Sequence, residues 1–294
     1  MSSAPSRALG LTWGLAACAL VAFAANSILC RQALGVRAPD SQSIDAATFT
    51  SIRLVSGALM LLLLSRLQTA RDERQSAALS WWPAVALFSY AAFFSLAYRW
   101  LTAGMGALLL FGAVQVTMIG GSFYRGERPG ARQWGGLASA LSGLLILVLP
   151  GLTAPSPVGC ILMAIAGVSW GCYSLLGRGV TQPLLATSGN FSRAVPLTLL
   201  FSLGSWIATT APQYSLRGIV LAMVSGAITS GLGYVIWYRA LRGLTSLQAA
   251  TIQLAVPILS AIGGVLLMNE PFPSRLAIAT PLVLGGIAWS MRSR

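Results

Sequence analysis

Charged residues are scarce in this sequence: they make up 9% of its 294 residues, against 56% that are hydrophobic. A soluble domain carries about 25% charged residues, because water must solvate its surface. Most of the surface of this protein must therefore face something other than water. The composition predicts an integral membrane protein, and no segment is long and polar enough to form a separate soluble domain.

Histidine and lysine are both absent, since all nineteen basic residues are arginine. Without histidine, the commonest acid–base group and metal ligand is missing. The sequence also lacks paired aspartates for a metal site and a base that would activate a nucleophilic serine. These absences argue against an enzyme, and we expect neither a metal ion nor another cofactor.

The few cysteines do not suggest a metal or disulfide framework. No pair has CxxC spacing, and all of them fall within or at the ends of apolar runs, at Cys18, Cys30, Cys160 and Cys172. We interpret them as small buried hydrophobic residues.

Long apolar runs are what the sequence has in abundance. A bilayer core about 30 Å thick needs roughly 20 apolar residues per helix. Windows of about 19 residues predict ten spans, near 9–32, 47–68, 81–99, 103–124, 132–150, 158–177, 189–209, 217–237, 246–267 and 274–291. The first run is longer than the apolar part of a signal peptide, about 7–15 residues, so we expect it to be retained as a helix.

The arginines predict the orientation of these spans. If the N-terminus is cytoplasmic, thirteen arginines lie at cytoplasmic ends and six at the other side. We expect the protein to lie in the inner membrane. The positive-inside rule then places both termini in the cytoplasm. The formal charge of +13 is spread between apolar runs rather than along one stripe, so we expect no nucleic-acid partner.

The two halves of the chain resemble each other. Arg53 and Arg193 open the second span of each half, and Tyr98-Arg99 after the third span matches Tyr238-Arg239 after the eighth. Five spans per half is an odd number, so the second half must enter the membrane in the opposite sense. An inverted 5+5 repeat is a common plan of secondary transporters, and it divides the chain into repeats at 1–150 and 151–294.

In these features the chain resembles the drug/metabolite transporter superfamily with two EamA-type halves, and especially the YddG-type aromatic amino acid exporters. The residues that carry the resemblance are Trp170-Gly171, Arg53, Arg193, Pro257, Glu127 and Glu270. The first half departs from the pattern, with Phe23-Ala24 where Trp-Gly is common and Val116-Thr117 where a proline is usual. The resemblance implies an all-helical exporter of amino acids and related metabolites that works by alternating access.

The acidic residues bear on the mechanism of transport. All six lie in loops or at helix ends in the predicted layout, at Asp40, Asp45, Asp72, Glu73, Glu127 and Glu270. A carboxylate at the bilayer centre costs about 2.5–3.5 kcal/mol on insertion scales and is kept mainly for function. Its absence disfavours proton-coupled export of lipophilic cations. A neutral or zwitterionic substrate that moves down its own gradient fits better, while Glu127 and Glu270 are expected to cap helices.

Aromatic and amide side chains within the spans are the candidate substrate-binding residues. A ligand pocket is mostly apolar and aromatic, with a few placed polar groups. The set is Asn26, Tyr90, Phe94, Tyr98, Phe111, Gln115, Trp170, Tyr173, Tyr234, Tyr238, Gln248, Thr251 and Gln253. Pro257 is a candidate gating residue, because proline frees a backbone carbonyl and can kink its helix. The alternative stays open that these rings form interfacial belts and the amides only join helices.

The predicted function is export of amino acids and related small molecules. The alternatives are export of drugs or nucleoside-like solutes, and a non-transporting membrane scaffold or lipid-binding protein. The expected partners are a small-molecule substrate and the lipid bilayer, and the expected state is a monomer.

Overall fold

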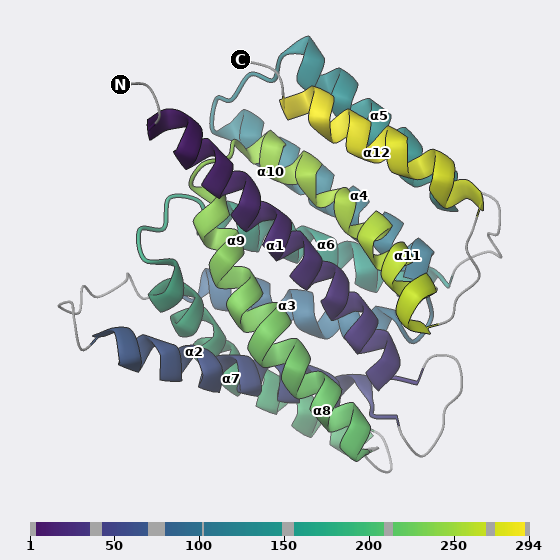
Figure 1. The fold of residues 1–294 in the computed structure, drawn as a ribbon. Coiled ribbons are helices and arrows are strands. Elements are labelled where there is room, and N and C mark those ends of the chain that lie inside the picture. Colours follow the sequence, from purple (N-terminus) through teal and green to yellow (C-terminus); the bar gives the residue numbers. More distant parts are fainter. Residues whose placement is uncertain are drawn as a thin grey trace.

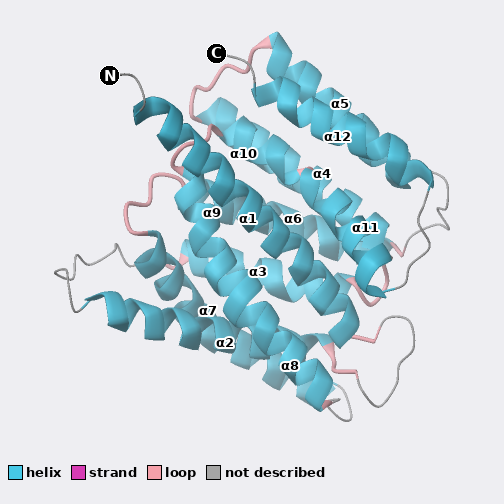
Figure 2. Ribbon diagram, in the orientation of Figure 1, coloured by secondary structure: helices cyan, strands magenta, loops and turns pink. Residues whose placement is uncertain are grey.

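The computed structural model describes residues 4–35, 43–69, 80–101, 103–148, 156–208, 214–268 and 274–291. All regular structure within these ranges is helical (Figure 2). The helices are α1 (Ala4–Ala33), α2 (Ala46–Thr69), α3 (Trp82–Ala97), α4 (Ala103–Tyr124), α5 (Ala131–Val148), α6 (Pro157–Gly177), α7 (Pro183–Ala208), α8 (Leu216–Val224), η1 (Ser225–Leu232), α9 (Gly233–Leu241), α10 (Ser246–Gln253), α11 (Ala255–Met268) and α12 (Ser274–Met291).

Each predicted span coincides with a helix or a run of helices. The boundaries agree within five residues except at α7, which begins at Pro183 and so six residues before the predicted start at 189. Proline is favoured in the first turn of a helix, where its missing N–H costs nothing. The prediction placed the start too late because residues 183–188 are only weakly apolar.

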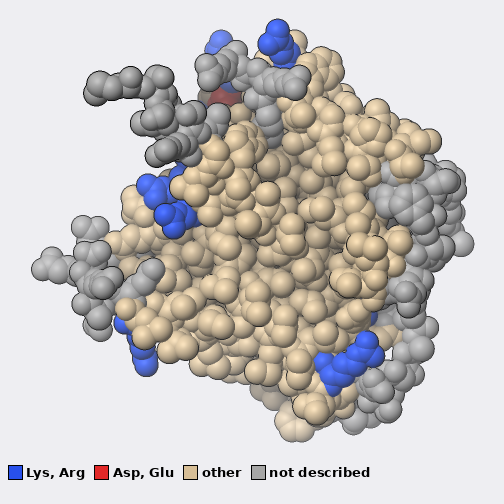
Figure 3. All heavy atoms as spheres, viewed as in Figure 1, with Lys and Arg blue, Asp and Glu red and all other residues tan. Residues whose placement is uncertain are grey.

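Several helices are long and apolar enough to cross a membrane. By length and composition these are Gly10–Ala33, Ala46–Leu67, Pro157–Gly177, Leu216–Leu241 and Ser246–Leu267. Shorter apolar helices lie at Trp82–Ala97, Leu109–Tyr124 and Ala277–Ser290. Figure 3 shows that the arginines on one face of the molecule lie at its margins, with a broad uncharged surface between them. This distribution is what a bilayer-facing surface requires.

The helices pack side by side from one end of the molecule to the other (Figure 1). α5 pairs with α12 at one end and α2 pairs with α7 at the other, while α3 and α4 both pack on α6 between them. Gly136 and Gly286 let α5 and α12 approach closely, since a Cβ at either position would overlap the backbone of the other helix. Between α6 and α4, a Cβ at Gly167 would overlap the backbone of Leu110 and one at Gly171 the side chain of Thr117, a close approach that GxxxG spacing favours.

The eighth predicted span is not a uniform α-helix. Its middle turns, Ser225–Leu232, form the π-helical segment η1 between α8 and α9. The side-chain oxygen of Asn26 on α1 accepts hydrogen bonds from Ser225 and, at 3.4 Å, from the Thr229 hydroxyl. π-helical turns are rare and recur at functional sites, and this one brings its residues against α1 and α2.

The ninth predicted span is interrupted at Leu254, between α10 and α11. Pro257 follows three residues later and has no N–H to donate to the carbonyl of Gln253. The interruption therefore lies where this proline removes a helical hydrogen bond. Pro196, by contrast, lies inside α7, which continues through it.

Candidate functional site

Six aromatic rings from three helices form an unbroken series at the centre of the molecule, which we call the aromatic column. Successive ring centroids are 4.8, 5.4, 5.0, 5.6 and 4.9 Å apart, within the range of favourable aromatic contacts. In order, its members are Tyr98, Phe94 and Tyr90 of α3, Trp170 and Tyr173 of α6, and Tyr238 of α9. All six are buried.

The helical repeat explains why these rings meet. Tyr90 and Phe94 are four residues apart on α3, and Tyr98 caps its end, so all three project from one face. Trp170 and Tyr173 are three apart on α6, which packs against α3. The packing of α3 against α6 therefore brings the rings of the two helices together in the column.

Further aromatic rings, outside the column, pack around Trp170. Phe23 of α1 lies 5.0 Å from the Trp170 ring, and Tyr234 of α9 lies 4.8 Å from it. Phe23 also lies 5.6 Å from the buried ring of Trp237. Trp170 is thus enclosed by rings from α1, α3, α6 and α9.

Two glutamines connect this centre to the interrupted helix α10–α11. The indole N–H of Trp170 donates to the side-chain oxygen of Gln253 at 2.6 Å. The side-chain amide of Gln115 on α4 donates to the carbonyl of Ala250 at 2.7 Å, and its own oxygen is buried without a partner among the described residues. Within the same described ranges, no hydrogen bond of ordinary geometry joins the buried hydroxyl of Tyr173 to a partner. Unpaired buried polar atoms are uncommon and are suited to receiving a ligand.

Arg53 of α2 lies beside the aromatic column and is fully buried. Its Nε donates to the Ser230 hydroxyl at 2.8 Å and its Nη2 to the Tyr234 hydroxyl at 2.6 Å. The guanidinium carbon is 5.2 Å from the centre of the Tyr90 ring and 5.8 Å from that of Phe94, a cation–π arrangement. Ser230 belongs to η1, so the π-helical segment helps to hold this arginine.

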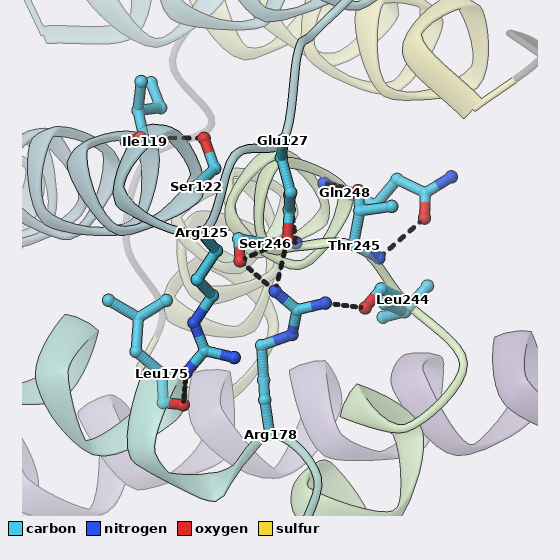
Figure 4. Close-up of polar contacts among 10 residues, drawn as sticks. All are labelled: Ile119, Ser122, Arg125, Glu127, Leu175, Arg178, Leu244, Thr245, Ser246 and Gln248. Atoms are coloured by element: carbon cyan, nitrogen blue, oxygen red, sulfur yellow. Dashed lines mark hydrogen bonds and ion pairs between the residues drawn. The ribbon is translucent and has the colours of Figure 1, made fainter.

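A polar latch lies at another place in the fold, where the α4–α5 loop, the end of α6 and the start of α10 meet (Figure 4). Glu127 pairs with Arg178 at 2.6 Å and accepts from the backbone N–H of Ser246 at 3.0 Å. Arg178 also donates to the carbonyl of Leu244 at 2.9 Å and to the Ser246 hydroxyl. We call Glu127, Arg178 and Ser246 the latch.

The latch determines the protonation of its carboxylate. Burial by itself raises the pKa of Glu127, but the hydrogen bonds from Arg178 and Ser246 and the charge of Arg178 outweigh it. The pKa therefore lies below its ordinary value, and the group is charged at neutral pH. Glu127 was expected to cap a helix, and it does so for α10 rather than for α5, which follows it in the chain. Glu270 lies outside the described residues.

Comparison with known proteins identifies the family. The EamA-like transporter family matches residues 157–292. An uncharacterised protein of Pseudomonas aeruginosa is 49% identical over 280 residues, which cover 94% of this chain and 93% of that protein. The chain belongs to the EamA-like transporter family. It is therefore a member of the drug/metabolite transporter superfamily and a multi-pass membrane protein for a small-molecule substrate.

Two further likenesses agree with this assignment. A protein of Escherichia coli named "Probable amino-acid metabolite efflux pump" is 23% identical over 199 residues, covering 64% of this chain and 67% of that protein. A protein of known crystal structure superposes with a TM-score of 0.76 over 95% of this chain and 96% of the other, at 17% identity. The second likeness concerns the fold alone.

In this EamA-like transporter, eight of the thirteen predicted substrate-binding residues gather at the aromatic column or are bonded to it. These are the six column residues, Tyr234 and Gln253. Gln115 reaches the same helix, α10, through its bond to Ala250. The sequence therefore identified most of the rings that meet.

The remaining predicted residues have other contacts. Asn26 bonds to η1, and Thr251 donates to the carbonyl of Leu247 at 2.8 Å. Gln248 forms a capping box with Thr245 at the start of α10. Phe111 is buried in α4, and no ring contact joins it to the column within the described ranges. For all thirteen predicted residues, substrate contact stays a prediction.

Sequence reasoning missed three residues of this site: Arg53, Phe23 and Trp237. Arg53 could have been found, since it falls inside the predicted span 47–68, where a charged residue usually marks function. Phe23 and Trp237 gave no such signal, because an apolar ring in an apolar helix is as consistent with lipid contact as with the centre of the protein.

Proposed function

We propose that this EamA-like transporter exports amino acids and related small metabolites across the inner membrane. The observation that supports this proposal is the aromatic column, which includes the Tyr173 hydroxyl and has the side chains of Gln253 and Gln115 beside it. Rings suit an apolar or aromatic side chain, and the few polar atoms suit the backbone groups of an amino acid. The name of the Escherichia coli relative supports the same substrate class.

Alternating access between two inverted halves is the mechanism that we propose. In a 5+5 repeat divided at 1–150 and 151–294, α2 corresponds to α7 and α5 to α12. In the structure α2 packs on α7 and α5 packs on α12, contacts that are compatible with a two-fold axis in the membrane plane. The contact of α3 with α6 likewise has its counterpart in the contact of α1 with α9. Movement of one set of helices against the other would expose the column to each side in turn.

The latch supports a conformation that is closed at the cytoplasmic side. With the N-terminus in the cytoplasm, the end of α6 and the start of α10 face the cytoplasm, and Arg178 pairs there with Glu127 of the first half. The buried column lies beyond it. Opening toward the cytoplasm would break this ion pair, and the interruption at Leu254 next to Pro257 gives α10 a hinge for that movement.

Uptake of labelled amino acids by proteoliposomes, with and without an imposed pH gradient, tests the proposal. We expect saturable uptake of Phe, Trp, Thr or Met that does not respond to the gradient, because the described spans carry no buried acid that would bind a proton. Liposomes without protein are the control. Gradient-driven uptake would refute the facilitative mechanism, and uptake of nucleosides or drugs instead of amino acids would refute the substrate class. Purified protein that moves none of these solutes would favour a scaffold or lipid-binding role.

A further inference from the structure

The buried Arg53 beside the column supports an inference that goes beyond the proposed function. This inference rests on the proposed function. We propose that Arg53 is the anion-binding residue of the central site, and that the transported solute carries a carboxylate which pairs with it. The solute's apolar part would then lie along Tyr90 and Trp170.

The first argument is charge. A guanidinium stays protonated in proteins, and Arg53 is fully buried in a helix long and apolar enough to span a membrane. Within the described part of the chain, its side chain donates to Ser230 and Tyr234, which are neutral hydroxyls. Buried charges are normally paired with an opposite charge, and in this position the solute is the group that can supply it.

The two carboxylates within the described residues are committed elsewhere. Asp45 accepts from the backbone N–H groups of Ala47 and Thr48, both at 2.9 Å, at the start of α2. Glu127 is held in the latch. Neither carboxylate is among the hydrogen-bond partners of Arg53.

The second argument is an unused donor. Among the residues that the structure describes, no hydrogen-bond partner meets the buried Nη1 of Arg53. If the arginine served only to join α2 to η1 and α9, the bonds from Nε and Nη2 would suffice, and the third nitrogen would be an uncompensated cost. A carboxylate can accept from Nη1 and from Nη2 together, because the planar guanidinium presents its donors as a fork.

The third argument is position. The guanidinium carbon lies 5.2 Å from the centre of the Tyr90 ring, and Tyr90 lies 5.0 Å from Trp170 in the column. Tyr234 contacts both, since it accepts from Arg53 and its ring lies 4.8 Å from Trp170. A solute whose carboxylate meets Arg53 therefore has aromatic surface within reach on the same side.

The test compares matched ligands by isothermal titration of the purified full-length protein at neutral pH. The pairs are 3-phenylpropionate with 3-phenylpropanamide, and hexanoate with hexanamide; phenethylamine is added as a cation. Within each pair shape is nearly constant and only the negative charge changes. We expect the dissociation constant of each acid to be at least about ten-fold lower than that of its amide. The amine should bind more weakly than either the acids or the amides.

Variants assign that preference to one residue. Arg53→Gln should abolish the preference for the acid, and Arg53→Lys should keep its sign at reduced size. Arg99→Gln is the matched control, because it removes one exposed arginine at the end of α3 and should leave the preference intact. If Arg53→Gln does not fold, the comparison on the unaltered protein still decides whether a carboxylate is preferred, and Arg53→Lys assigns the preference to this residue.

Amides that bind as tightly as acids would overturn the proposal, as would a preference for acids that survives Arg53→Gln or acids that do not bind at all. The outcome is separable from that of the transport assay. Preferential binding of acids without flux would refute the transport proposal alone, whereas amino acid flux without any such preference would refute the role of Arg53 alone.

Discussion

Trp170 and Gln253 are joined by a 2.6 Å hydrogen bond from the indole N–H to the side-chain oxygen. The bond connects the middle of the aromatic column with the last residue of α10, directly before the interruption at Leu254. Gln253 also donates to the carbonyl of Ala249 at 2.9 Å, so both ends of its amide are used. A change at the hinge would therefore reach Trp170, a ring in direct contact with four others.

Gln253→Leu should therefore impair both stability and transport. It leaves the buried N–H of Trp170 without an acceptor, which costs about 1–3 kcal/mol. Thermal unfolding in detergent and uptake by proteoliposomes measure the two effects. Trp170→Phe removes the donor instead, and the double variant should be less unstable than the sum of the single ones. Strict additivity would mean that the bond contributes nothing.

Opening of the latch is the second expectation. Glu127→Gln removes the charge that pairs with Arg178, so the α10 segment should separate from α6 and the α4–α5 loop more often. A cysteine introduced at the buried Ala249, in a background without the four native cysteines, should react faster with a maleimide in this variant. Arg128→Gln, at the exposed neighbouring residue, is the matched control. Equal labelling rates in both variants would show that the latch does not close this side.

The latch should also respond to pH. The pKa of Glu127 is lowered by its bonds to Arg178 and Ser246, after the opposing effect of burial. A group with a lowered pKa in the folded state contributes stability above its ordinary pKa and loses it as the pH falls through the lowered value. The labelling rate at position 249, divided by that of a free thiol at the same pH, should therefore rise in the acid range below the ordinary carboxyl pKa and stay flat near neutrality. Glu127→Gln should lack this acid response.

Pro257→Ala tests the hinge. Alanine restores the N–H that can bond to the carbonyl of Gln253, which would favour one continuous helix in place of α10 and α11. We expect a higher melting temperature and slower transport, because the interruption at Leu254 would be harder to bend. Pro281→Ala is the control, since that proline lies inside α12, away from the column. Transport at the normal rate by Pro257→Ala would remove this residue from the gate.

Close packing beside Arg53 gives a prediction on stability. A Cβ at Gly226 would overlap the carbonyl oxygen of Arg53 and the hydroxyl of Ser56, so Gly226→Ala should force α2 away from η1. Overpacking of this kind costs about 1–3 kcal/mol. Gly285→Ala meets no atom within 4 Å and should leave the melting temperature unchanged or raise it slightly. Similar melting temperatures for the two variants would contradict the close contact.

The positions of the helices were determined by the sequence itself. An apolar run of about 20 residues that ends in turn residues is a local signal, and the signal predicted all ten runs with boundaries that differ by a few residues. The rings of α3 could also be placed on one face, since a separation of four residues fixes their relative direction. The family resemblance rested on similarly local motifs, and the comparisons confirm it.

Only the tertiary structure decided which of these residues meet. Arg53 and Tyr234 are separated by 181 positions, and Trp170 and Gln253 by 83. Each pairing depends on how far its helices rotate about their own axes, and nearly uniform apolar sequences leave that rotation undetermined. The latch, the π-helical turn that carries Ser230 and the unused donor of Arg53 share this origin, because each results from contacts between helices rather than from the sequence of one helix.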